Sequence, residues 1–261
     1  MKVLLKILAF LALFSAGFVL LRTSAEYRVV LAMDLKDLGG VPSLYTTLGT
    51  IFSFLAAFVV QSGWAGWGSL VSVIRNEINA LDRLWLMSFW FARATGANLR
   101  RELRRYVELA IAEGWGGASP GDGDGNLDRL LVNLGQLVVH GATPREASYA
   151  ASSVLGELAG YRRERLHFSA RRMPPFLRYT LILACAMVIG LSLLIGVRSV
   201  PLDYLFTTSI ALLAYVVYLL ADDLDNPCRP GLWHVSPEEY RRLMRKMEAP
   251  ELQERLSAIS S

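Results

Sequence analysis

The stretch LYTTLGTIFSFLAAFVVQ, residues 44–61, decides the fold of this chain. It contains no charged residue, and the apolar run continues to about Trp64. A helix needs roughly 20 residues to cross the hydrocarbon of a bilayer, so the stretch predicts a membrane-spanning helix. Comparable runs extend from Val3 to Leu21, from Tyr179 to Val197 and from Tyr204 to Ala221. The sequence therefore predicts four transmembrane helices.

The composition supports a membrane protein. Of 261 residues, 53% are hydrophobic and only 19% are charged, which excludes a disordered, collagen-like or disulfide-scaffold chain and argues against a wholly soluble enzyme. The two cysteines, Cys185 and Cys228, lack CxxC spacing, so neither a disulfide nor a zinc site is expected.

The basic residues predict the orientation. With the N-terminus in the cytoplasm, 23 of the 27 Lys and Arg residues lie inside, and those outside are Arg22, Arg28, Lys36 and Arg198. Cytoplasmic loops carry an excess of Lys and Arg, so we expect both termini to be cytoplasmic. The run from Val3 to Leu21 could also be a signal peptide, but it exceeds the roughly 7 to 15 apolar residues usual there, which favours a retained helix.

Helical patterns also mark the cytoplasmic parts. Apolar residues recur at helical spacing from Leu70 to Trp85, and this helix is expected to continue to about Glu113 with a break near Gly96. Thr143-Pro-Arg-Glu146 is a capping box that predicts a helix to about Arg172, and Ser236-Pro-Glu-Glu239 predicts another that ends before Pro250. Residues 114–125 form a glycine-rich connector. The run Asp122-Gly-Asp-Gly-Asn126 in it lacks the glycine and glutamate positions of an EF-hand, so a flexible turn is expected.

These elements predict an all-α fold: a four-helix transmembrane subunit with a long helical cytoplasmic half. We expect transmembrane helices 1 and 2 in residues 1–64, a cytoplasmic helical region in 65–175, transmembrane helices 3 and 4 in 176–221 and a cytoplasmic tail in 222–261.

Residues 46–61 sort their side chains by face. At about 100° per residue, one arc collects small, hydroxyl and amide side chains with a single aromatic, whereas Leu44, Leu48, Ile51, Phe52, Leu55 and Val59 fall on the far side. We call this arc the 46–61 stripe; its members are Thr46, Thr50, Ser53, Phe54, Ala57 and Gln61. Polar groups at membrane depth require protein or water, so the stripe predicts either a packing interface between helices or a pore lining.

Three carboxylates end the fourth span: Asp222, Asp223 and Asp225. They oppose the helix macrodipole, which favours cations there, so local helix stability does not explain them. Ion pairs with nearby arginines, cation binding and a charged pore mouth all remain open. A weaker stripe runs along the same span: Tyr204, Thr208, Ala211, Tyr215 and Tyr218.

No catalytic motif is present, so no enzymatic activity, cofactor or metal site is expected. Nothing in the sequence pairs a nucleophile with a base, and the three histidines fall on separate segments. The arginines 100, 101, 104 and 105 lack the aromatic pattern of nucleic-acid binding and indicate a solvated or headgroup-facing surface.

Several short segments resemble, in order and spacing, the bestrophin-like bacterial membrane proteins. They are residues 45–60, Asn79-Ala-Leu81, Thr143 to Arg165, and Leu224-Asp-Asn-Pro227 with Val235-Ser-Pro237, so the resemblance covers about residues 40–245. It implies a multi-pass subunit of the bacterial cytoplasmic membrane, assembled as a symmetric homo-oligomer, a pentamer, around the second helix.

More distantly, residues 54–64 are similar to the pore helix of the bestrophin channels. By position, the hydrophobic neck of that family falls on Thr46, Thr50 and Phe54, and two of these are hydroxyls here. Asn226-Pro227 resembles the motif after the last span, but Cys228 replaces its usual Phe and the long acidic run is absent, so calcium regulation is not implied.

The expected function is a homo-oligomeric ion channel whose second span lines the pore, with the lipid bilayer, its own copies and small inorganic ions as partners. The alternative is a non-conducting membrane scaffold that binds a partner protein. The sequence leaves the sign of the ion open.

Overall fold

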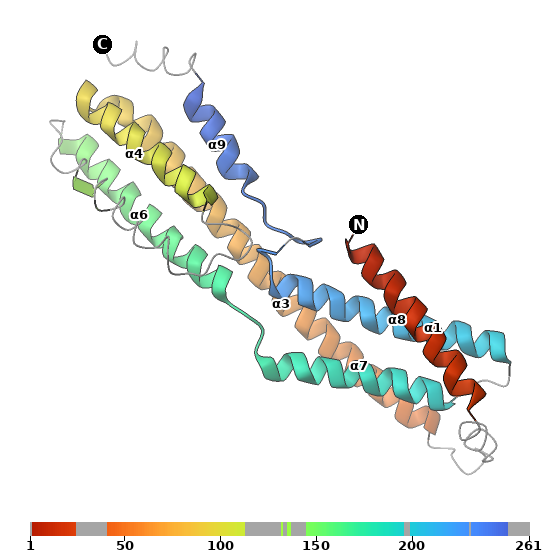
Figure 1. Cartoon of the computed structure of the whole chain (residues 1–261). Helices are drawn as coiled ribbons and strands as arrows, with labels where there is room; N and C mark the ends of the chain where they lie inside the picture. Colours follow the sequence, from red (N-terminus) through yellow and green to blue (C-terminus); the bar gives the residue numbers. More distant parts are fainter. Residues whose placement is uncertain are drawn as a thin grey trace. The chain divides into compact units, whose positions relative to one another are not determined.

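A computed structural model describes residues 2–24, 41–112, 132, 135–136, 145–195, 199–229 and 231–249. These residues contain no strand, which confirms the all-α fold class. The elements, in chain order, are α1 (Lys2–Thr23), α3 (Val41–Met87), the 3-10 turn Ser88–Trp90, α4 (Arg93–Ala112), α6 (Arg145–Ala170), α7 (Pro175–Ile195), α8 (Val200–Asp225) and α9 (Glu238–Glu248) (Figure 1).

The chain divides into two compact units, residues 1–65 with 172–226 and residues 66–171 with 227–261. Among the described residues, four helical stretches are long and apolar enough to cross a membrane, and they fall on α1, α3, α7 and α8. The four spans predicted from the sequence are therefore present as helices.

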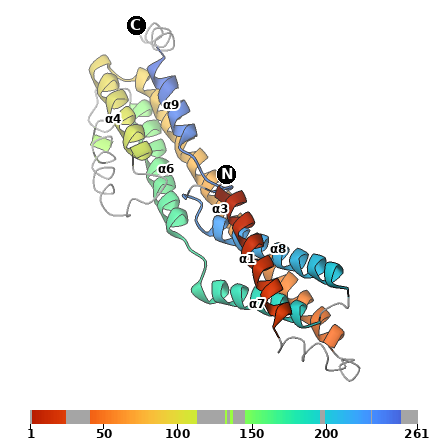
Figure 2. The ribbon, with the colours of Figure 1, turned by 45° about the vertical axis from the view of Figure 1, so that its right-hand side comes forward.

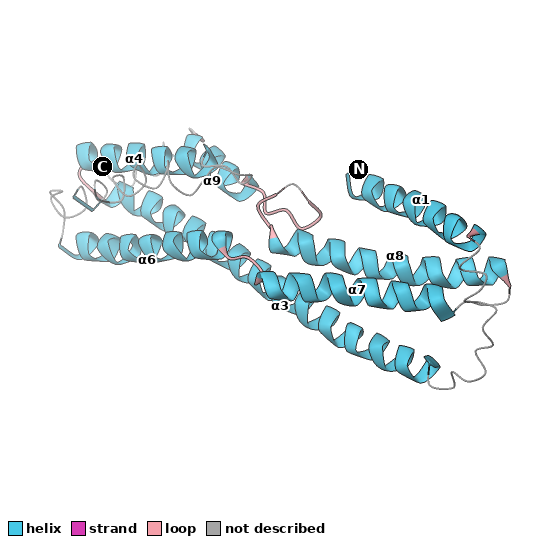
Figure 3. Ribbon diagram, turned by 60° about the horizontal axis from the view of Figure 1, so that its bottom comes forward, coloured by secondary structure: helices cyan, strands magenta, loops and turns pink. Residues whose placement is uncertain are grey.

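In the first unit, α7 and α8 lie side by side and α3 packs against them (Figure 3). The contact face of α3 carries Phe52, Ala56 and Val59, all buried. Their partners include Leu181 on α7 and Ala214 on α8. One stripe of α3, spaced three and four residues apart, thus forms the core of the membrane-spanning unit.

α1 packs along α8 in the same unit. The rings of Phe10 and Tyr215 stack with centroids 4.1 Å apart, and the Ser15 and Tyr204 hydroxyls are hydrogen-bonded at 2.6 Å. Tyr204 and Tyr215, two members of the weaker stripe of the fourth span, therefore face α1.

An ion pair joins the ends of α1 and α8. The guanidinium of Arg22 contacts the Asp203 carboxylate, which is only 2% exposed. Arg22 also lies over the Phe18 ring, 5.8 Å from its centroid. Burying a carboxylate without a partner costs free energy, and the ion pair with Arg22 offsets this cost for Asp203.

In the second unit, the C-terminal half of α3 packs with α4, α6 and α9 around one apolar core (Figure 2). Each helix contributes fully or almost fully buried leucines: Leu81 from α3, Leu103 from α4, Leu158 from α6 and Leu243 from α9. The apolar residues that recur at helical spacing from position 70 onward are the contribution of α3 to this core.

The break expected near Gly96 occurs earlier. α3 ends at Met87, and a 3-10 turn precedes α4. Gly96 lies inside α4, where a Cβ would sit 2.3 Å from the carbonyl oxygen of Ser88. The glycine therefore permits close packing of α4 on the turn, and it does not end the helix.

α6 extends from Arg145 to Ala170 and ends before the Pro174-Pro175 pair, as expected. α9 begins at Glu238, one residue after the predicted first helical position: its N-cap is Pro237, and no side chain caps it. Thr143, Pro144, Pro250 and the glycine-rich segment 114–126 lie outside the described residues.

Candidate functional site

Every member of the 46–61 stripe is exposed on the single subunit. Phe54 is 74% exposed, and Thr46, Thr50, Ser53, Ala57 and Gln61 are also open. The far face is divided: Phe52 and Val59 are buried against α7 and α8, whereas Leu44 and Ile51 remain 69% and 59% exposed. The stripe thus lies on the side of α3 turned away from the core of its own unit.

Two stripe hydroxyls are bonded within the helix. Thr50 donates to the carbonyl of Thr46, and Ser53 donates to the carbonyl of Gly49, both at 2.8 Å. Such bonds to residue i−4 satisfy the hydroxyl protons inside a membrane helix. The exposed amide of Gln61 is therefore the stripe group with the strongest need for water or protein.

The acidic end of α8 makes several local contacts. Asp222 pairs with Arg178 of α7 at 2.6 Å, and the Asp225 carboxylate accepts the backbone N–H of Met173. These side chains line a small pocket together with Tyr218. The ion-pair interpretation therefore holds for Asp222, whose side chain is still 30% exposed.

The remaining residues of this segment end the helix. Asp223 is half-buried, and its carbonyl accepts the N–H of Asn226, the C-cap of α8. The carbonyl of Pro227 accepts the N–H of Val235 at 2.9 Å. No group of three His, Cys, Asp or Glu side chains that could hold a metal occurs among the described residues.

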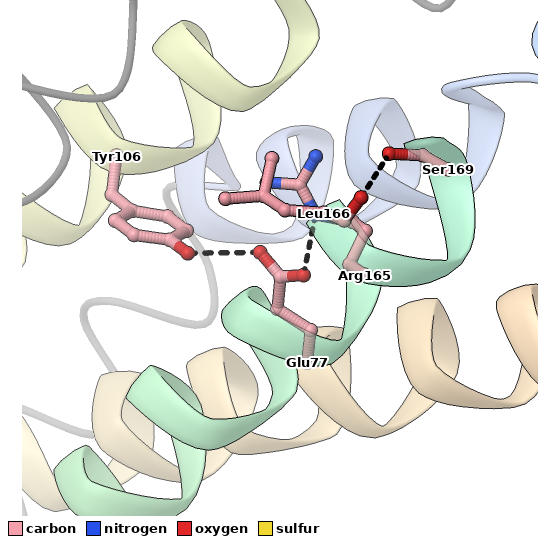
Figure 4. Close-up of polar contacts among 5 residues, drawn as sticks. All are labelled: Glu77, Tyr106, Arg165, Leu166 and Ser169. Atoms are coloured by element: carbon pink, nitrogen blue, oxygen red, sulfur yellow. Dashed lines mark hydrogen bonds and ion pairs between the residues drawn. The ribbon is translucent and has the colours of Figure 1, made fainter. Parts of the chain in front are cut away.

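A second polar centre, absent from the sequence predictions, lies in the core of the second unit (Figure 4). Glu77 of α3 is fully buried, and its Oε1 accepts the Tyr106 hydroxyl of α4 at 2.8 Å. Its Oε2 accepts Nε of Arg165 from α6 at 2.7 Å. Tyr240 of α9 is also fully buried, and the negative charge of Glu77 helps to raise its pKa. We call Glu77, Tyr106, Arg165 and Tyr240 the Glu77 cluster.

The surroundings of the Glu77 cluster keep both tyrosines protonated. Burial, followed by the negative charge of Glu77, raises the pKa of Tyr106 well above its ordinary value. The same two causes raise the pKa of Tyr240. Both phenols are therefore neutral at physiological pH, and the Tyr106 hydroxyl donates its proton to the Glu77 carboxylate.

One signal in the sequence could have revealed this cluster. Glu77 falls between Ile74 and Leu81 on the apolar face of a helix, where a carboxylate is rarely buried unless it is paired. Its partners come from distant segments, and periodicity within one helix does not identify them.

This chain is similar to known proteins in both sequence and fold. The bestrophin-like domain matches residues 8–240. A bacterial bestrophin homologue from Klebsiella pneumoniae with the mutation L177T superposes with a TM-score of 0.73 at 15% identity, covering 93% of this chain and 97% of the other. The I180T variant gives 0.73 at 13% identity, with coverage of 94% and 100%. No curated protein matches the sequence. Because the domain match covers most of the chain, and the structural likeness shows the same fold, this protein belongs to the bestrophin-like family.

Proposed function

We propose that this chain forms a homo-oligomeric ion channel of the bacterial cytoplasmic membrane, with α3 lining the pore and both termini in the cytoplasm. The family is of the channel type, which supports ion conduction at a general level. The observation that carries the specific proposal is the exposure of the entire 46–61 stripe on the face of α3 opposite its buried contacts.

Rotational symmetry of the assembly would bring the exposed face of α3 from every subunit to one central ion pathway. Copies of one subunit arranged around an axis present the same helix face to the centre. Hydroxyl and amide groups there can meet water, whereas facing lipid they would leave Gln61 without a partner. A pentamer, implied by the resemblance to the bestrophin-like proteins, is the assembly we propose.

Within such a pore, Phe54 is the bulky apolar member of the stripe. A ring of Phe54 side chains is a hydrophobic constriction, and such constrictions gate by excluding water. Asp222, Asp223 and Asp225 are the proposed ion-interacting groups of the cytoplasmic mouth. If they reach the conduit, their charge favours cations, although Arg178 offsets that of Asp222.

The competing proposal is a non-conducting scaffold. In that case the stripe packs against another membrane helix, which small and hydroxyl residues also favour. The proposals differ in whether the stripe contacts water.

Cysteine accessibility tests the difference. In a background with Cys185 and Cys228 replaced, cysteines at Thr46, Thr50, Ser53 and Ala57 should react rapidly with small water-soluble thiol reagents. Cysteines at Leu48 and Leu55, both partly buried, should react several times more slowly. Equal protection on both faces of assembled protein would refute the pore and favour the scaffold.

A further inference from the structure

Two arginines of α4, Arg100 and Arg104, lie on aromatic rings of the second unit. The Cζ atom of Arg100 is 4.4 Å from the centroid of the Phe89 ring. The Cζ atom of Arg104 is 5.2 Å from the centroid of the Trp85 ring. Both rings are buried, and their centroids are 6.0 Å apart. Stacking on neighbouring rings therefore holds the two guanidinium groups in defined positions. We call Arg100 and Arg104 the arginine pair.

Hydrogen bonds to neutral oxygens fix the arginine pair further. Nη1 of Arg100 donates to the carbonyl and hydroxyl oxygens of Ser88, both at 3.3 Å. Nη2 of Arg104 donates to the carbonyl of Met247 in the last turn of α9 at 2.8 Å. Nε of Arg104 is buried and has no hydrogen-bond partner within the described part of the chain. A guanidinium carries five N–H donors, so the described residues use only a minority of the donors of the pair.

The charges of the arginine pair have no carboxylate partner among the described residues, where both guanidiniums bond only to neutral oxygens. Arg165, the buried arginine of the same unit, is paired with Glu77. Arginine stays protonated in proteins, so the pair carries two positive charges. Burial, followed by the charge of Arg104, lowers the pKa of Arg100, so the two charges repel one another.

Helix stability does not explain this placement of like charges. Arg100 and Arg104 are one turn apart, and like charges at this spacing destabilise a helix. Arg101 and Arg105 repeat the spacing, but they are exposed, as expected for a solvated surface. Water and salt screen an exposed pair, whereas the half-buried arginine pair is screened less. An anion bound between the two guanidiniums would offset their repulsion.

We propose that the arginine pair binds a phosphate monoester or inorganic phosphate, one for each subunit. Such a group carries a charge of about −1.5 to −2 at pH 7, which matches two guanidiniums, and its oxygens can accept the paired N–H donors of each. The phosphate can belong to a soluble molecule or to a lipid headgroup. This site lies within the second unit and goes beyond the proposed channel, because it does not require ion conduction.

Equilibrium dialysis with radiolabelled inorganic phosphate tests the site in assembled full-length protein in detergent. The parent should bind phosphate saturably. Arg100→Gln with Arg104→Gln should weaken binding by about tenfold or more, because glutamine has neither the charge nor the paired donors. Arg101→Gln with Arg105→Gln is the matched control: it removes two charges at the same spacing from the same helix and should keep the parent affinity.

A second arm identifies the source of the phosphate. Phosphatidic acid in mixed detergent micelles is compared with phosphatidylcholine, which has no net charge. A ligand that binds the folded state raises the melting temperature. A rise with phosphatidic acid that requires the arginine pair supports a site for a lipid headgroup. Phosphate binding in dialysis without such a rise supports a soluble ligand.

Two results overturn the proposal. Equal loss of binding in the two double variants would assign binding to the general positive charge of α4, and a parent that responds to neither inorganic phosphate nor phosphatidic acid has no such site. If the Arg100 and Arg104 double variant does not assemble, the single changes decide: weaker binding in Arg100→Gln than in Arg101→Gln supports the site, and equal binding overturns it. Ion flux plays no part in this test, so the channel proposal and the phosphate site can fail separately.

Discussion

At the scale of single residues, the most specific prediction about the conduit concerns Phe54. Phe54→Ala should widen and wet the proposed constriction, because a ring of methyl groups no longer excludes water. Ion flux into reconstituted liposomes, normalised to assembled oligomer, should therefore increase.

Two phenylalanines serve as controls for this change. Phe176 on α7 is 77% exposed, close to the 74% of Phe54, and Phe176→Ala should leave the flux unchanged. Phe52 is buried, so Phe52→Ala should lower the yield through a cost of roughly 3 to 5 kcal/mol without raising the normalised flux. Unchanged or lower flux in Phe54→Ala would remove Phe54 as the constriction.

At the scale of elements, the turn between α3 and α4 depends on Gly96. Gly96→Ala should destabilise the second unit by about 1 to 3 kcal/mol, because the new Cβ meets the backbone oxygen of Ser88, which cannot move like a flexible side chain. Gly156→Ala in α6 is the control: its Cβ meets nothing within 4 Å, so the change should be neutral or stabilising by up to about 1 kcal/mol. Thermal unfolding in detergent measures both, and equal effects would contradict the packing role of Gly96.

The elements also show what a sequence can predict. The four spans and the approximate positions of α6 and α9 follow from local signals: apolar length and the prolines that flank these helices. The break after α3 was predicted at the wrong place, because the constraint on Gly96 is a tertiary contact with Ser88 and not a local preference for ending a helix.

In the candidate sites, too, local features can be predicted from the sequence, whereas contacts between distant segments cannot. The arc of the 46–61 stripe can be predicted from the 3.6-residue period alone, and its exposure agrees with that geometry. The Arg178–Asp222 pair and the Glu77–Arg165 pair join segments far apart in the chain, and periodicity contains no information on such partners.

At the scale of the whole molecule, the distribution of basic residues makes a topological prediction. With 23 of 27 Lys and Arg residues assigned to the inside, a reporter fused after Ser261 or inserted near Gly121 should be active in the cytoplasm. A fluorescent and a phosphatase reporter at each position measure this, because the first works inside and the second outside. A periplasmic signal at either position would overturn the proposed orientation.

The contact between Arg22 and Asp203 has a consequence for the order of events during synthesis. The two residues are 181 positions apart, and a ribosome adds roughly 5 to 20 residues per second, so about 10 to 40 s separate their appearance. During this interval the long side chain of Arg22 can extend to the membrane surface, where its charge stays hydrated. α1 therefore gains this partner only after α8 has entered the bilayer, long after α1 itself has been made.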